Sequence, residues 1–207
     1  QADVSASAFD SWLDTRDEKP FFAQIGFFES HLGTQFHERE SKYYPYPEPE
    51  TEHLHIPPYL ESNEVGKKTV GILQGYLKRG DEAIGRILES LRTRGLEENT
   101  LVVMGVDHGV GLPRSKASMY DPGISVSWLM RLPGAIPSSL VLPAMATHVD
   151  VLPTIYGLLG WDKPDQFLGQ DFSSQIRNPE NQEELNEMIF AQVEEGLRCV
   201  RTNDYKF

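Results

Sequence analysis

Residues 102–116 read VVMGVDHGVGLPRSK, an apolar stretch that leads into a carboxylate and an imidazole and ends on a lysine. The apolar run over residues 99–106 predicts a strand buried on both faces. Ligands of open α/β sheets gather beyond the carboxyl ends of the strands, and Asp107 and His108 follow this run at that place. Gly109 permits a turn there, so both side chains could approach one ion. The stretch therefore predicts a strand and a candidate site at its end.

The chemistry of these side chains leaves two interpretations open. A hard divalent cation would favour the oxygens of Asp107, and His108 could ligate it or orient a bound anion. Alternatively, the aspartate caps the following turn beside a solvated histidine. Lys116 alone would be an ordinary surface lysine, and its nearness to the other two residues makes it a candidate. His31 follows another apolar run, PFFAQIGFF at residues 20–28, so two parallel strands could share a crevice at their ends.

Helical and strand patterns alternate through the middle of the chain. An amphipathic helix is expected over residues 67–94, with Gly95 at the position of a C-cap. The run at residues 124–134 predicts another buried strand, and residues 147–161 predict a helix with Thr147 as N-cap. Strand, helix and strand in succession predict an α/β layer fold.

The length and the 39% hydrophobic content suit one sizeable core, so all 207 residues are expected to belong to a single domain. Residues 32–66 are rich in proline and are expected to form a long loop, of the length that lids and binding segments have. Residues from about 172 to 207 are expected to begin a C-terminal segment. The helical pattern around Phe9 starts without a leader, so we expect a domain that is incomplete at its N-terminus.

The overall charge restricts the partners. Nineteen basic and 31 acidic residues give a formal charge of −12, which would repel nucleic acid and anionic membranes at long range. An anionic substrate must therefore meet locally placed cations. The single cysteine, Cys199, excludes an intrachain disulfide and a multi-cysteine zinc cluster. No stretch approaches the roughly 20 apolar residues of a membrane span.

Several blocks, taken in order, resemble the sulfatases of the alkaline-phosphatase superfamily. The block KPFFAQIGFFESH is similar to a strand of that family that delivers a site histidine. YLKRGDEAIGRILESLRTRGLEENTLVVMGVDHG resembles its helix followed by the Asp-His-Gly strand. LPRSKASMYDPGISVSWLMRLPG resembles the block of the site lysine, and THVDVLPTIYGLLG and RCVRTNDYKF resemble the later helix and strand. The resemblance covers nearly all of residues 9–207.

The resemblance implies an alkaline-phosphatase-like α/β fold with a mostly parallel central sheet flanked by helices. It also implies hydrolysis of a sulfate ester or sulfamate by a formylglycine nucleophile beside Ca²⁺. Matched residue by residue, Asp107 would be a calcium ligand and His108 would take the place of a neighbouring Asn or His ligand. Lys116 would bind the sulfate oxygens, and His31 would contact the sulfate or the leaving-group oxygen. The substrate would be a small molecule or glycan, in an exported or lysosomal-type setting.

The sequence departs from the family pattern in the nucleophile. Neither the D-D pair nor a C-x-P-x-R or S-x-P-x-R motif occurs in these residues, and CVRTN at Cys199 does not fit the latter. We therefore expect these residues alone to lack the nucleophile. Two alternatives stay open: a nucleophile-free relative that acts as a binding or scaffold module, and a phosphodiesterase or phosphonate hydrolase of the same superfamily.

Overall fold

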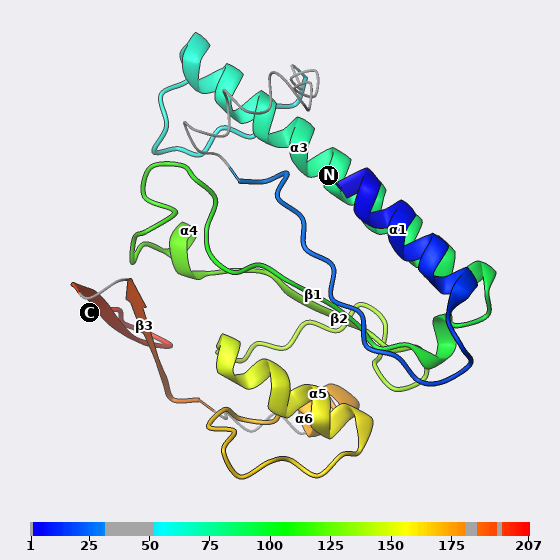
Figure 1. Ribbon diagram of the computed structural model, residues 1–207. Helices are drawn as coiled ribbons and strands as arrows, with labels where there is room; N and C mark the ends of the chain where they lie inside the picture. The colour runs from blue at the N-terminus through cyan, green and yellow to red at the C-terminus, as the bar shows by residue number, and fades with distance from the viewer. Residues whose placement is uncertain (1, 32–51, 181–185, 194–195) are drawn as a thin grey trace. The chain divides into compact units, whose positions relative to one another are not determined.

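The structure is a computed structural model that describes residues 2–31, 52–180, 186–193 and 196–207 (Figure 1). The chain divides into two compact units, which are described separately. The first unit comprises Gln1–Glu97 and His108–Lys116, and the second comprises Glu98–Asp107 and Ala117–Phe207. The chain first passes from one unit to the other at a short 3-10 helix, η1 (Glu97–Asn99).

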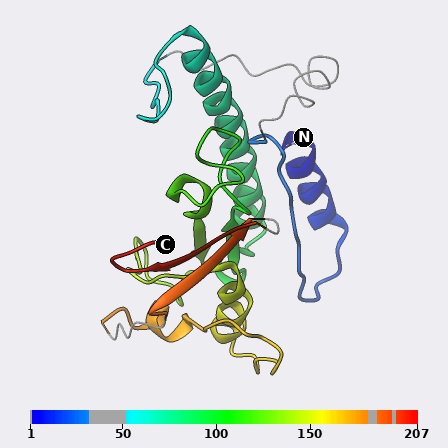
Figure 2. The same ribbon diagram turned by 90° about the vertical axis from the view of Figure 1, so that its left-hand side faces the viewer.

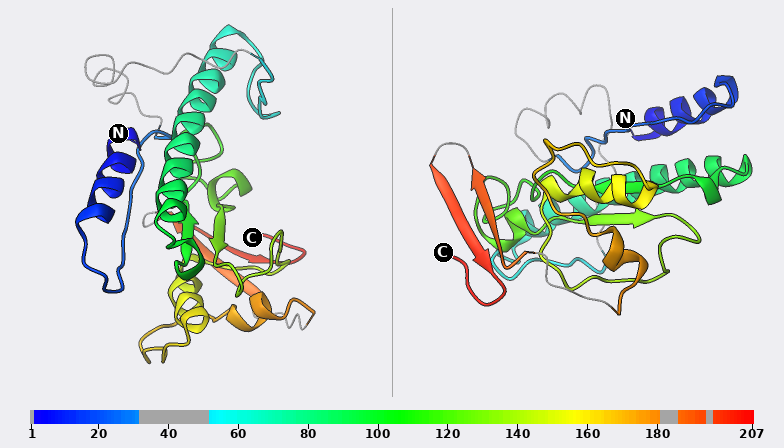
Figure 3. Two further views of the ribbon diagram at one scale, coloured as in Figure 1. Left: turned by 90° about the vertical axis from the view of Figure 1, so that its right-hand side faces the viewer. Right: turned by 90° about the horizontal axis from the view of Figure 1, so that it is seen from below.

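The first unit is built on two long helices, α1 (Ala2–Thr15) and α3 (Glu64–Thr93), which lie side by side (Figures 1 and 3). Small residues make the close approach: Ala2 and Ala6 of α1 and Ala83 of α3 are almost fully buried together. The helices run in the same direction, because residues later in α1 contact residues later along the C-terminal half of α3. These contacts are Asp3–Arg86, Asp10–Ser90, Asp10–Arg94 and Asp14–Arg94.

Helix α3 confirms the amphipathic helix predicted at residues 67–94, and its ends follow from local capping. It begins at Glu64, earlier than predicted, because the side chain of Asn63 accepts a hydrogen bond of 2.9 Å from the Gly66 N–H. It ends before Gly95, whose φ of 67° is the left-handed conformation that glycine adopts readily at this position. The Leu96 N–H then bonds the Leu91 carbonyl oxygen at 2.9 Å, which completes the cap.

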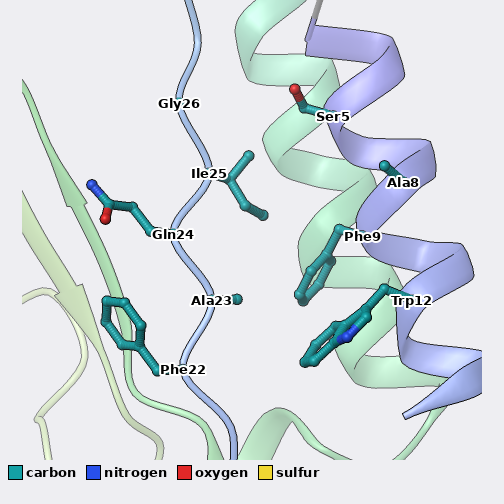
Figure 4. Close-up of a pocket in the computed structure, with 9 residues that line it drawn as sticks. All are labelled: Ser5, Ala8, Phe9, Trp12, Phe22, Ala23, Gln24, Ile25 and Gly26. Carbon is teal, nitrogen blue, oxygen red and sulfur yellow. The ribbon is translucent and has the colours of Figure 1, made fainter.

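The strand predicted at residues 20–28 is not found: this segment runs extended without pairing to any described strand. Its side chains still alternate, with Ala23 and Ile25 facing α1 and Phe22 and Gln24 on the opposite side (Figure 4). The face toward α1 is only partly covered: Phe21, Ile25 and Phe27 are half-buried, Ala23 is exposed, and Phe22 on the other side is 87% exposed. The apolar run therefore reflects one packed face rather than burial on both. Of the predicted loop 32–66, residues 32–51 lie outside the described part of the chain.

The second unit contains a pair of strands, β1 (Val102–Gly105) and β2 (Trp128–Arg131), that run antiparallel with Val102 opposite Arg131. This corrects the prediction of a mostly parallel sheet, because both sheets in the described residues are two-stranded and antiparallel. Between β1 and β2 the chain forms one helical turn, α4 (Asp121–Ile124). A parallel pairing needs a crossover, usually a helix packed on the sheet, and the residues between β1 and β2 contain only this one helical turn.

The core of the second unit lies beside this pair. A 3-10 turn, η2 (His148–Asp150), leads into α5 (Val151–Leu159), which packs against α6 (Ser173–Arg177). Figure 1 shows α5 and α6 as neighbours. The buried side chains are those of Leu158, Phe172 and Ile176. Leu101 and Met130 pack onto them. Apolar burial of this kind is the main source of stability in a small core.

The second unit ends in a hairpin of β3 (Met188–Val193) and β4 (Leu197–Thr202), drawn in orange and red in Figure 2. The later strand expected from the resemblance of RCVRTNDYKF is thus present as β4. The carboxylate of Asp121, at the start of α4, accepts bonds from Arg201 at 2.8 Å and from Lys206 at 2.6 Å. In the described residues, no helix combines the length and the apolar composition of a membrane span.

Candidate functional site

The structure brings His31 and Lys116 together in the first unit. Lys116 Nζ lies 3.0 Å from His31 Nε2, although the residues are 85 positions apart in the chain. An ammonium group has donors only, so the imidazole nitrogen is the acceptor and the proton of a neutral His31 lies on Nδ1. The pair therefore presents a fixed positive charge and a proton-transfer group at one point of the surface.

A tight turn positions His31. The His31 N–H bonds the Phe28 carbonyl oxygen at 3.0 Å, which closes a turn after the extended segment. Glu29 within that turn is only 5% exposed, and its carboxylate accepts bonds from the Phe28 N–H at 3.1 Å and from the Ala2 N–H. Burial alone would raise the pKa of Glu29, but the bond from the Ala2 backbone helps to hold it below its usual range. The ionised carboxylate thus ties the turn to the start of α1.

A strained loop positions Lys116. The Lys116 N–H bonds the Val110 carbonyl oxygen at 3.0 Å, and the preceding residue, Ser115, is completely buried. Arg114 and Ala117 have φ values of 57° and 58°, the left-handed region that residues with a Cβ seldom adopt. Such conformations cost free energy and persist where the surrounding structure enforces them, often at functional sites. The backbone on either side of Lys116 is therefore held in one unusual path.

Asp107 and His108 follow β1, as the sequence predicts. The Val106 N–H bonds the Ser127 carbonyl oxygen at 3.2 Å, which extends the strand pairing to the residue before Asp107. Both side chains are exposed. His108 Nδ1 lies 2.9 Å from the Gly109 carbonyl oxygen, which can only accept, so Nδ1 carries a proton and Nε2 of a neutral ring has the lone pair. Nε2 of His108 is thus the ring nitrogen that could act as a ligand.

Asp107 and His108 do not by themselves form a metal site. Across the described ranges of the chain, no three His, Cys, Asp or Glu side chains gather as a set that could hold an ion. Calcium takes six to eight oxygen ligands, so Asp107 fits such an ion as one ligand among several. Asp107 belongs to the second unit, whereas His31, His108 and Lys116 belong to the first. A single pocket formed by all four residues stays a prediction.

A contact that the sequence did not suggest involves His148. Its Nε2 lies 2.9 Å from the Val106 carbonyl oxygen, directly before Asp107, and all three residues belong to the second unit. The sequence predicts Thr147 as a helix cap, which accounts for the start of the turn. It assigns no role to His148, the residue that follows. Only the three-dimensional approach of η2 to the end of β1 reveals this contact.

The first unit also has an open apolar cleft between α1 and the extended segment (Figure 4). Phe9 and Trp12 project from α1 toward Ala23 and Ile25, and the remaining lining residues carry no charge. A sulfate ester requires positive groups around its oxygens. The cleft therefore does not suit an anionic ester, and the Lys116–His31 pair does.

Comparison with solved structures defines the class of fold. A protein from a glycosaminoglycan-metabolising locus of Bacteroides thetaiotaomicron matches with a TM-score of 0.72 at 22% identity, over 98% of this chain and 47% of that one. A phosphonate monoester hydrolase from Silicibacter pomeroyi matches with a TM-score of 0.55 at 26% identity, over 65% of this chain and 27% of that one. The fold is that of the sulfatases, which is alkaline-phosphatase-like.

Comparison of sequences gives the family. An ulvan-active sulfatase of Formosa agariphila is 28% identical over 208 residues, which cover 84% of this chain and 35% of the relative. The family model described as Sulfatase matches residues 2–161. The chain therefore belongs to the sulfatase family, and it spans about a third of the length of this curated relative.

Proposed function

We propose that the chain is the central and later portion of a sulfatase that hydrolyses a sulfate ester or a sulfamate at a calcium-assisted site. The 3.0 Å contact between Lys116 and His31 carries the proposal, because it places a cation and a proton-transfer group together. Family membership supports the reaction class. The name of the ulvan-active relative supports a sulfated glycan as the substrate.

Lys116 is the proposed ligand of the sulfate oxygens. A tetrahedral anion gains most from positive groups that are fixed before it binds, since no reorganisation is then needed during the reaction. The strained backbone at Arg114 and Ala117 supports such fixation. The chain as a whole is strongly acidic, so a local cation is required for an anionic ester to bind at all.

His31 is the proposed proton donor to the leaving group. Without an anion, its Nε2 accepts a bond from Lys116. When sulfate oxygens accept the Lys116 N–H bonds instead, Nε2 can take up a proton from solvent and pass it to the leaving-group oxygen. General acid catalysis of this kind typically contributes 10²–10⁴-fold in rate.

Asp107, with His108 beside it, is the proposed contribution of these residues to the calcium site. When bound, the ion would stabilise negative charge on the sulfate oxygens. The carboxylate of Asp107 suits this hard cation, and the Nδ1 proton of His108 leaves its Nε2 oriented as the nitrogen ligand. The nucleophile is not supplied by these 207 residues, which contain no C-x-P-x-R or S-x-P-x-R motif.

The likeness to a phosphonate monoester hydrolase keeps a second reaction under consideration. The substrate preference of the full-length protein separates the two. We expect a higher kcat/KM for 4-nitrophenyl sulfate and sulfated oligosaccharides than for a 4-nitrophenyl phosphonate monoester. We also expect EDTA to lower sulfate release and added Ca²⁺ to restore it. A preference for the phosphonate ester would contradict the proposal, and so would binding of sulfated oligosaccharides without any turnover.

A further inference from the structure

The backbone at the end of β1 is held at both of its polar groups. The Val106 N–H donates to Ser127 on the neighbouring strand, and the Val106 carbonyl oxygen accepts from His148 Nε2 at 2.9 Å. This carbonyl belongs to the same planar peptide unit as the backbone nitrogen of Asp107. Fixing the carbonyl therefore restricts the direction in which the Asp107 side chain leaves the backbone.

The geometry also defines the state of the His148 ring. A carbonyl oxygen can only accept, so Nε2 carries the proton in this contact. The ring is on the exposed surface of η2, where its N–H reaches back to the strand end. The contact is thus a directed hydrogen bond from an exposed ring.

The turn that carries His148 is anchored by a buried carboxylate. Asp150 is only 2% exposed, and it accepts bonds of 2.7 Å from the backbone N–H groups of Thr147 and Gln170. The Thr154 hydroxyl donates to the Asp150 carbonyl oxygen at 2.8 Å, which links the turn to α5. His148 therefore projects from a rigid base toward Val106.

We propose that His148 is a positioning residue for the metal ligand Asp107. Its N–H fixes the Val106–Asp107 peptide, which restricts the directions in which the Asp107 carboxylate can point before the ion arrives. This inference rests on the proposed function, because it takes Asp107 as a calcium ligand. Groups that hydrogen-bond directly to a metal ligand typically change metal affinity by 10- to 100-fold when they are removed, and we expect an effect at the lower end of this range here.

A purely structural role makes a different prediction. If the hydrogen bond only attached η2 to the strand, its loss would change thermal stability equally with and without Ca²⁺. If the bond positions Asp107, its loss weakens Ca²⁺ binding. Direct measurement of Ca²⁺ affinity therefore distinguishes the two roles and does not depend on enzyme activity.

The experiment compares two substitutions of similar size in the full-length protein. His148→Met removes the donor, whereas His148→Gln keeps an N–H at the end of a similarly long side chain. Isothermal titration of the EDTA-treated protein with Ca²⁺ should show a dissociation constant raised about 10-fold or more in H148M. H148Q should stay within about 3-fold of the wild type, as should His55→Met, which alters another exposed histidine.

Asp107→Asn separates failure of this inference from failure of the proposed function. If D107N binds Ca²⁺ as tightly as the wild type, the assignment of Asp107 as a metal ligand is wrong, and the inference falls with it. If D107N loses Ca²⁺ while H148M binds it like the wild type, the positioning role of His148 alone is overturned. Because the ring is exposed, both His148 variants are expected to fold, and their melting curves without Ca²⁺ provide the check.

Discussion

Lys116 lies between two residues whose backbones are left-handed although both carry a Cβ atom. Such residues cost roughly 1–2 kcal/mol each relative to an ordinary conformation. The cost is borne in a loop where Ser115 is completely buried and the Lys116 N–H bonds back to Val110. At the scale of single residues, the candidate site thus places the Lys116 side chain in a loop with a strained backbone.

Ala117→Gly should relieve part of this strain. Glycine adopts φ near 58° at little cost, so we expect the free energy of unfolding to rise by about 0.5 kcal/mol, net of the greater freedom of glycine in the unfolded chain. Urea denaturation of the full-length protein measures the change. Ala8→Gly is the matched control, because Ala8 lies inside helix α1, where glycine should destabilise by about 0.5–1 kcal/mol. Destabilisation by A117G would contradict the strain.

At the scale of elements, local signals predicted the helices and failed for the sheet. The apolar spacing of α3, with Asn63 before it and Gly95 after it, is contained in neighbouring residues, so the sequence sufficed. The partner of β1 depends on which distant strand reaches it and in what direction, and β2 returns antiparallel. The apolar run at residues 20–28 was wrongly predicted to be a buried strand. One partly buried face is enough to account for its apolar composition.

The junction between α4 and the β3–β4 hairpin predicts a pH dependence. The hydrogen bond from Lys206, aided by the charge of Arg201, holds the pKa of Asp121 below its usual range. The stabilisation is therefore full above the ordinary carboxyl pKa of about 4 and is lost as the pH falls through the lower folded-state pKa. Because the Asp121 side chain is 55% exposed, water screens the pairs and the effect stays under about 1 kcal/mol.

Asp121→Asn tests this dependence in the full-length protein. We expect a melting temperature slightly below that of the wild type at pH 7, and a difference that shrinks toward zero as the pH falls below about 4. Asp165→Asn, which changes another exposed carboxylate, is the control. A difference between D121N and the wild type that is unchanged at acid pH would show that ionisation of Asp121 does not stabilise the junction.

At the scale of the whole molecule, a chain with a formal charge of −12 is proposed to bind an anionic ester, and this requires cations at one defined place. The family resemblance in the sequence suggested His31 and Lys116, and the structure brings them to 3.0 Å within one unit. The resemblance did not suggest Glu29 or His148. Both side chains contact backbone groups, and only the folded chain brings Glu29 near Ala2 and His148 near Val106. Their contacts connect the candidate residues to α1 and α5.

The most direct test of the central claim is the sulfate-ester kcat/KM of the full-length protein with Lys116→Ala, His31→Ala and both changes together. Each single change should lower kcat/KM by about 10²–10³-fold, because each removes a group that acts on the transferring sulfate. The double variant should be much less impaired than the product of the single losses, since the two groups act as a unit. Lys163→Ala, which alters another exposed lysine, should leave kcat/KM unchanged. Wild-type turnover by K116A or by H31A would contradict the account.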